Sequence, residues 1–104
     1  ELQTEDITNP TAVITYTGSD PTNIPFVVTI TFSEEVQNFV EGDLSIGNGT
    51  ASGLSTTNGI VYTVTISPTA QATVSVILPA GNVQDLAGNS NEESNPITVD
   101  FDSI

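Results

Sequence analysis

Hydrophobic and polar residues alternate with a period of two in several short segments of the chain. The alternation is clearest at residues 26–33, FVVTITFS, where every second side chain is apolar. The same period continues through residues 60–67 and 72–79, and shorter alternating segments lie at 12–16 and 96–101. A period of two places successive side chains on opposite faces of a strand, whereas no ten-residue segment repeats with the period of a helix. The pattern therefore predicts an all-β protein whose strands each bury one face.

Turn signals divide the remaining sequence and complete the set of strands. Weaker strand candidates at residues 43–47 and 50–55 flank the Asn-Gly pair at 48–49, which we interpret as a hairpin turn. A second Asn-Gly pair at 58–59 marks another turn. Seven short strands separated by such signals predict an immunoglobulin-like antiparallel β-sandwich of Greek-key type. The chain has no Cys and no Trp, so only the architecture of an antibody domain is expected, without its core disulfide.

Successive strands of such a sandwich run in alternating directions, which divides the connections between its two ends. The connection after residue 33, the turn at 58–59 and the long connection 80–95 are then expected at the end where the chain enters. The C-terminus is expected to leave from the opposite end. The predicted organisation is an inter-repeat linker at 1–8, the sandwich at 9–102 and the start of a following linker at 103–104.

The charge of the chain is one-sided. Its 104 residues fit a single domain, and they include 13 acidic residues but no Lys, Arg or His, which gives a net charge of −13. No side chain can neutralise a phosphate, so nucleic acid and an anionic membrane surface are excluded as direct partners. The ligands that such a chain attracts are cations.

The same composition argues against an enzyme. Without His, Cys or Lys, the chain offers no common general base, thiol nucleophile or amine for a Schiff base. A pair of carboxylates remains, as in a glycosidase, but such a pair needs one acid whose pKa is raised in an apolar pocket. The acids of this chain are predicted in polar turns and at strand ends. We therefore expect no enzymatic activity.

Acidic and amide side chains gather in the predicted connections. The segment DLAGNSNEE, residues 85–93, carries three carboxylates and two asparagines within nine residues. Ca²⁺ takes 6–8 oxygen ligands from carboxylates, amides, carbonyls and water. The predicted calcium ligands are Glu5, Asp6, Glu34, Asp85, Asn89, Glu92, Asp100 and Asp102. The alternative is a solvated loop that Asn and Gly shape into turns, and the spacing of an EF-hand is absent.

The two ends of the sandwich become neighbours if copies follow one another in the same polypeptide. Asp100 and Asp102 lie two residues apart, which places both carboxylates on one face of a strand at the C-terminal end. In a tandem array these residues meet Glu5 and Asp6 of the following copy. Because the chain begins without Met, we expect it to be a piece of a longer protein. The predicted partners are neighbouring copies of the same repeat.

Several motifs resemble a known family of repeats. The segments that carry the resemblance are DITNP, ITFSEEV, GDLSIGNGT, YTVTISP and VSVILPAGNVQDLAGNSN, and they cover most of residues 9–101. Together they are similar to the bacterial Ig-like repeats of giant surface adhesins. The more specific pieces are Phe-Ser-Glu-x-Val at 32–36 and Pro-Ala-Gly followed by Asp-x-Ala-Gly-Asn within 79–89.

The resemblance implies a function as well as a fold. Such modules are strung in tandem as an extracellular stalk on the bacterial cell surface, where they extend a distal binding domain. In some arrays, including those of marine RTX-type adhesins that bind ice or other cells, calcium stiffens the linkers. On this likeness Asp6, Glu34 and Asp85 are candidate ligands. The alternative function is a ligand-binding module at the tip of an adhesin, although the long connection 80–95 carries no aromatic residue for such a site.

Overall fold

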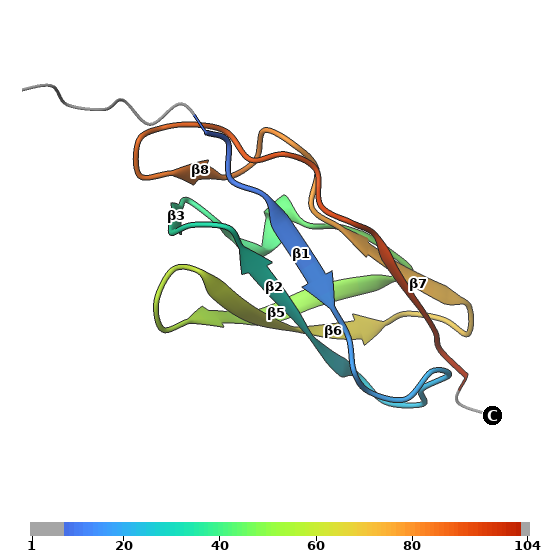
Figure 1. Cartoon of the computed structure of the whole chain (residues 1–104). Helices are drawn as coiled ribbons and strands as arrows, with labels where there is room; N and C mark the ends of the chain where they lie inside the picture. The colour runs from blue at the N-terminus through green and yellow to red at the C-terminus, as the bar shows by residue number, and fades with distance from the viewer. Residues whose placement is uncertain (1–7, 103–104) are drawn as a thin grey trace, which may run out of the picture.

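Two antiparallel sheets pack face to face in the computed structural model, which describes residues 8–102 (Figure 1). The spatial order of the larger sheet is β1 (Ala12–Thr15), β2 (Phe26–Phe32), β6 (Val61–Pro68) and β5 (Gly49–Thr56). The order of the smaller sheet is β4 (Ser45–Gly47), β7 (Thr73–Ile77) and β9 (Ile97–Asp100). Four strands facing three in this order is the arrangement of an immunoglobulin constant-type sandwich, so the predicted fold class is confirmed.

Three short elements lie in the connections. The two-residue strands β3 (Val36–Gln37) and β8 (Gln84–Asp85) pair with each other, and a 3₁₀ helix spans Glu41–Asp43. The alternation along the chain did not reveal them, because they are too short for a period to show. Within residues 8–102 no helix is long and apolar enough to cross a membrane.

The period-two pattern determines which side chains form the core. Along β2 the side chains of Phe26, Val28, Ile30 and Phe32 are buried, while the intervening residues face outward. β6 repeats the pattern and pairs with β2 in register, with Ile30 opposite Tyr62. Each fully buried aliphatic side chain contributes about 1.5–3 kcal/mol relative to an exposed one. The core therefore lies between the two sheets, as the alternation predicts.

Three aromatic rings close the core at the end where the chain enters. Phe39 contacts Phe32 and Tyr62 edge to face, with ring centroids 5.3 and 4.9 Å apart, and it is only 8% exposed. Phe39 belongs to no alternating segment, so its place in the core was not evident from the sequence. Phe101, expected in the core, is half-buried at the opposite end.

The hairpin predicted around residues 48–49 is wrong. The chain reverses direction at Asn48, whose φ is +61°, but β4 pairs with β7 and β5 pairs with β6, so the turn also changes sheet. The Asn48 side chain holds the β6–β7 loop: its Nδ2 donates to the backbone oxygens of Ala70 (2.8 Å) and Ala72 (3.3 Å). These long-range bonds stabilise a corner in place of a hairpin, since Asn tolerates the left-handed conformation.

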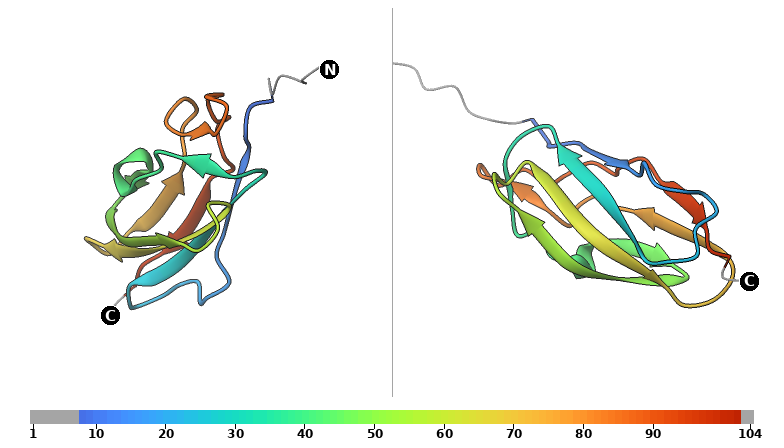
Figure 2. Two further views of the ribbon diagram at one scale, coloured as in Figure 1. Left: turned by 90° about the vertical axis from the view of Figure 1, so that its left-hand side faces the viewer. Right: turned by 90° about the horizontal axis from the view of Figure 1, so that it is seen from below.

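The connections divide between the two ends as predicted. The turn after β2, the β5–β6 turn and the β8 segment share the end where the described chain begins, and the C-terminus leaves from the other end (Figure 1). The β1–β2 loop and the β6–β7 loop lie beside the C-terminus (Figure 2). The sandwich therefore separates its entry from its exit by the full length of the strands.

Candidate functional site

Acidic residues lie outside the larger sheet. The strands β1, β2, β5 and β6 contain no charged residue, so the acids of the described chain lie in connections and at the end of β9. Within residues 8–102 no group of three or more acidic side chains is close enough to hold a metal ion. Of the predicted ligands, Glu5 and Asp6 lie outside the described residues. The calcium site stays a prediction.

Asp85 is the most buried of the predicted ligands. Its side chain is 0% exposed, and its Oδ1 accepts hydrogen bonds from the backbone nitrogens of Ala87 (2.9 Å) and Asn89 (2.8 Å). Its Oδ2 accepts from Nδ2 of Asn89 at 3.0 Å. Two backbone bonds, from Asp85 N to Asn89 O and from Gly88 N to Asp85 O, complete the turn. The carboxylate and the amide, both predicted as ligands, thus close the 85–89 loop on itself.

Asn91 organises the rest of the same connection. Its side chain is 3% exposed, and its Oδ1 accepts from the backbone nitrogens of Asn82 (2.9 Å) and Val83 (2.8 Å). Its Nδ2 donates to the backbone oxygens of Pro79 and Glu92, both at 3.0 Å. Four bonds satisfy the amide completely. This one buried side chain therefore links residues 79–83 to residues 91–92 on either side of the 85–89 loop, and no spacing in the sequence distinguished it from its neighbours.

The remaining acids at this end do not join Asp85. Glu92 is exposed and Glu34 is half-buried. Glu35, next along the chain, lies against the β5–β6 turn, where a Cβ added to Gly59 would stand 2.8 Å from its Cγ. Burial raises the pKa of the Tyr62 phenol, and the negative charge of Glu35 raises it further. This end of the sandwich therefore presents acids on separate loops.

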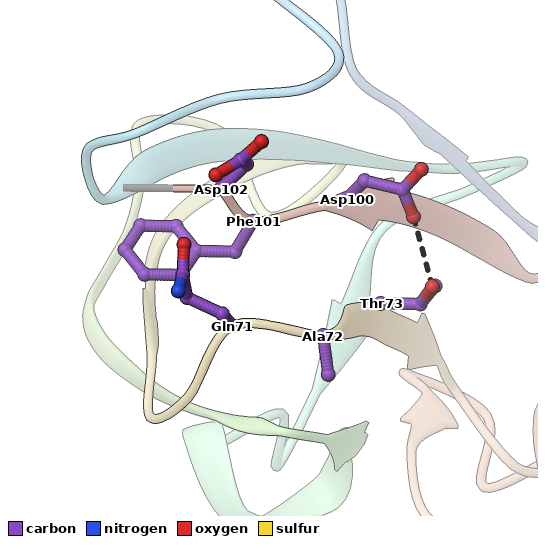
Figure 3. A pocket seen from close by; sticks show the side chains of 6 residues that line it. All are labelled: Gln71, Ala72, Thr73, Asp100, Phe101 and Asp102. Atoms are coloured by element: carbon purple, nitrogen blue, oxygen red, sulfur yellow. Dashed lines mark hydrogen bonds between the residues drawn. The ribbon is translucent and has the colours of Figure 1, made fainter. Parts of the chain in front are cut away.

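Asp100 and Asp102 border a shallow depression at the opposite end. The depression has a volume of about 410 Å³ and is lined by Gln71, Ala72, Thr73, Asp100, Phe101 and Asp102 (Figure 3). Figure 3 shows both carboxylates on the side of the segment away from the Phe101 ring. Oδ1 of Asp100 accepts a hydrogen bond from Oγ1 of Thr73 at 2.8 Å. Both acids are exposed, which leaves them accessible to a cation or to a neighbouring domain.

The comparisons with known proteins address the family of the chain. A family model described as a bacterial Ig-like domain matches residues 6–101. A search of curated protein sequences finds no match. The matched range covers all the strands of the sandwich and includes every predicted ligand except Glu5 and Asp102.

Proposed function

Because the chain belongs to the bacterial Ig-like domain family, we propose that it is a structural extender repeat of a large bacterial surface adhesin. Domains of this family commonly occur in extracellular and surface proteins, and they are generally structural modules. One observation carries the proposal: the chain enters the sandwich at one end and leaves at the other (Figure 1). Each copy in a tandem array then adds the length of its strands to the stalk. A distal binding domain is held away from the cell in this way.

Calcium at the junctions between copies is the second part of the proposal. In a head-to-tail array, Asp100 and Asp102 of one copy face the end of the next copy that carries Glu34, Asp85 and Glu92. Carboxylate oxygens are the ligands that Ca²⁺ prefers. The described part of one copy gathers no three acids, so in this proposal the acids of a neighbouring copy supply further ligands. Asp85 is buried and bonded within its own loop, so the exposed carboxylates of Asp100, Asp102 and Glu92 are the accessible ligands in this proposal.

The proposal is tested by comparing one repeat with two joined repeats. We expect millimolar calcium, added after EDTA, to raise the melting temperature of the tandem pair more than that of the single repeat. Magnesium and NaCl of equal ionic strength serve as controls, because screening alone also relieves the repulsion among the acids. One site at ten times its dissociation constant adds about 1.4 kcal/mol of stability.

A matched variant locates the ion. Replacing Asp100 and Asp102 by Asn in the first copy removes the acids from the junction, whereas the same change in the second copy leaves the junction intact. We expect only the first variant to lose the calcium response. Electron microscopy of longer arrays that shows freely jointed beads in calcium would overturn the rigid stalk.

The alternative function, an adhesive module at the tip, has less support. A tip needs side chains free to meet a ligand, but the long connection before β9 is occupied with its own hydrogen bonds through Asp85 and Asn91. The exposed apolar residues of that connection amount to isolated side chains such as Leu86. Cell-binding assays with the isolated repeat distinguish the two functions, since only the tip module retains adhesion.

A further inference from the structure

The first and last segments of the described chain lie side by side and run in the same direction (Figure 1, Figure 2). Their contacts keep a nearly constant register, with 81 residues between Ile14 and Asn95 and 80 between Asp20 and Asp100. The contacts begin where Glu92 N donates to Pro10 O (2.9 Å). They continue to the far end of the sandwich.

Asn95 supplies the central contact with its side chain. Oδ1 accepts from Ile14 N at 2.8 Å, and Nδ2 donates to Ile14 O at 2.9 Å. The amide group thereby takes the place of a neighbouring strand on the outer edge of β1, whose other edge pairs with β2. β1 is therefore an edge strand of its sheet that is hydrogen-bonded on both sides, to β2 on one edge and to Asn95 on the other.

The C-terminal end of the contact uses a carboxylate and the backbone. Oδ1 of Asp20 accepts from Asp100 N at 3.0 Å. Thr22 N donates to Asp100 O and Asp102 N donates to Thr22 O, both at 2.9 Å, in a parallel bridge between Thr22 and Phe101. The β1–β2 loop is therefore fastened to the segment through which the chain leaves.

We propose that these contacts form a mechanical clasp that resists tension applied between the two ends of the domain. Tension pulls β1 toward the entry end and β9 toward the exit end. Since the two segments are parallel, their hydrogen bonds lie across the direction of pull and are loaded in shear together, whereas peeling would break them one at a time. This inference rests on the proposed extender function, because a domain within a stalk is subject to tension between its two ends.

Single-molecule force spectroscopy of the repeat, flanked by marker domains, tests the clasp. Asn95→Ala removes both bonds to Ile14, and we expect the unfolding rate at a fixed force to rise about 10–30-fold. Asn48→Gly is the matched control, since it also removes the hydrogen bonds of an Asn side chain. Asn48 does not take part in the contacts between the first and last segments, and Gly keeps the left-handed conformation of this position accessible. If Asn95→Ala does not fold, Asp20→Ala replaces it, because Asp20 is exposed.

A second pulling geometry separates mechanical from general stability. The chain has no Cys, so Thr57→Cys in the exposed β5–β6 turn offers a unique handle for pulling against the C-terminus. In this geometry no force is applied at the entry end of β1, and Asn95→Ala should lower the unfolding force less than it does between the termini. Equal effects of Asn95→Ala in both geometries, or no effect between the termini, would overturn the clasp. The calcium test on joined repeats does not depend on this result, so either proposal can fail alone.

Discussion

Asn89 donates two hydrogen bonds to the carboxylate of Asp85, one from its backbone nitrogen to Oδ1 at 2.8 Å and one from Nδ2 to Oδ2 at 3.0 Å. A third bond comes from the backbone of Ala87. Because the chain has no Lys, Arg or His, these N–H groups replace the basic partner that a buried acid usually has. The loop and its acid therefore stabilise each other.

Removing this carboxylate should be costly. We expect Asp85→Ala to lower the free energy of unfolding by about 3 kcal/mol, since it deletes three bonds to a charged acceptor and leaves backbone N–H groups of the loop without partners. Asp85→Asn keeps one acceptor oxygen and should cost less. Urea denaturation measures both, with the exposed Glu92→Gln as a control expected within about 0.5 kcal/mol of the parent. An Asp85→Ala variant as stable as this control would contradict the role of the loop.

The strands were predictable because burial imposes their period. Phe26, Val28 and Ile30 alternate in the sequence for the same reason that they point inward in the sandwich. Phe39 and the corner at Asn48 were not predictable in this way. Their positions depend on partners distant in the sequence, such as Tyr62 for the ring and the β6–β7 loop for the amide. A local sequence pattern does not reveal contacts between residues that are distant along the chain.

The candidate site shows a similar division. The grouping of acidic and amide residues in the sequence indicated Asp85 and Asn89 as ligands, and the structure places both in the same turn. The sequence could not tell whether their oxygens serve a cation or their own loop, because both roles need the same acceptor groups at the same spacing. No feature of the sequence distinguished Asn91 and Asn95 from the other asparagines. Each is a polar residue among others until the fold brings it to the backbone that it satisfies.

Gly59 should resist substitution. Its φ of +74° is in the left-handed region, and an added Cβ would lie 2.8 Å from Cγ of Glu35. We expect Gly59→Ala to lower the free energy of unfolding by about 1–2 kcal/mol. Gly42→Ala is the control, because nothing lies within 4 Å of its added Cβ. Equal stability of the two variants in urea denaturation would show that the turn relaxes freely.

Two residues of one strand test which face of β2 is buried. Ile30 on β2 is 0% exposed, whereas Val27 on the same strand is 55% exposed. We expect Ile30→Ala to cost about 2–5 kcal/mol, from lost transfer energy and the cavity that remains. Val27→Ala should stay within about 0.5 kcal/mol of the parent. Melting temperatures and urea midpoints measure the contrast, and a reversed order would mean that β2 faces the other way.

The stability of the domain should fall at alkaline pH through Tyr62. Burial and then the charge of Glu35 raise the pKa of this phenol in the folded state above its ordinary value of about 10. Above that value the unfolded chain loses its proton first, so the folded state binds more protons and the free energy of unfolding decreases as pH rises. The contribution is fully present below pH 10 and is lost as pH rises through the folded pKa. Urea denaturation at pH 8 and at about pH 11 measures the fall.

Two variants attribute this fall to its cause. Tyr62→Phe removes the ionisable group and keeps the ring that packs against Phe32 and Phe39, so its stability should fall less between the two pH values than that of the parent. Glu35→Gln removes the nearby charge but leaves the burial, which is the larger cause, and should reduce the fall only in part. Because the chain has two tyrosines, the difference in phenolate absorbance between the parent and Tyr62→Phe reports the titration of Tyr62. A fall that is unchanged in Tyr62→Phe would contradict the assignment to this phenol, since the carboxylates are already ionised at both pH values and their repulsion stays the same.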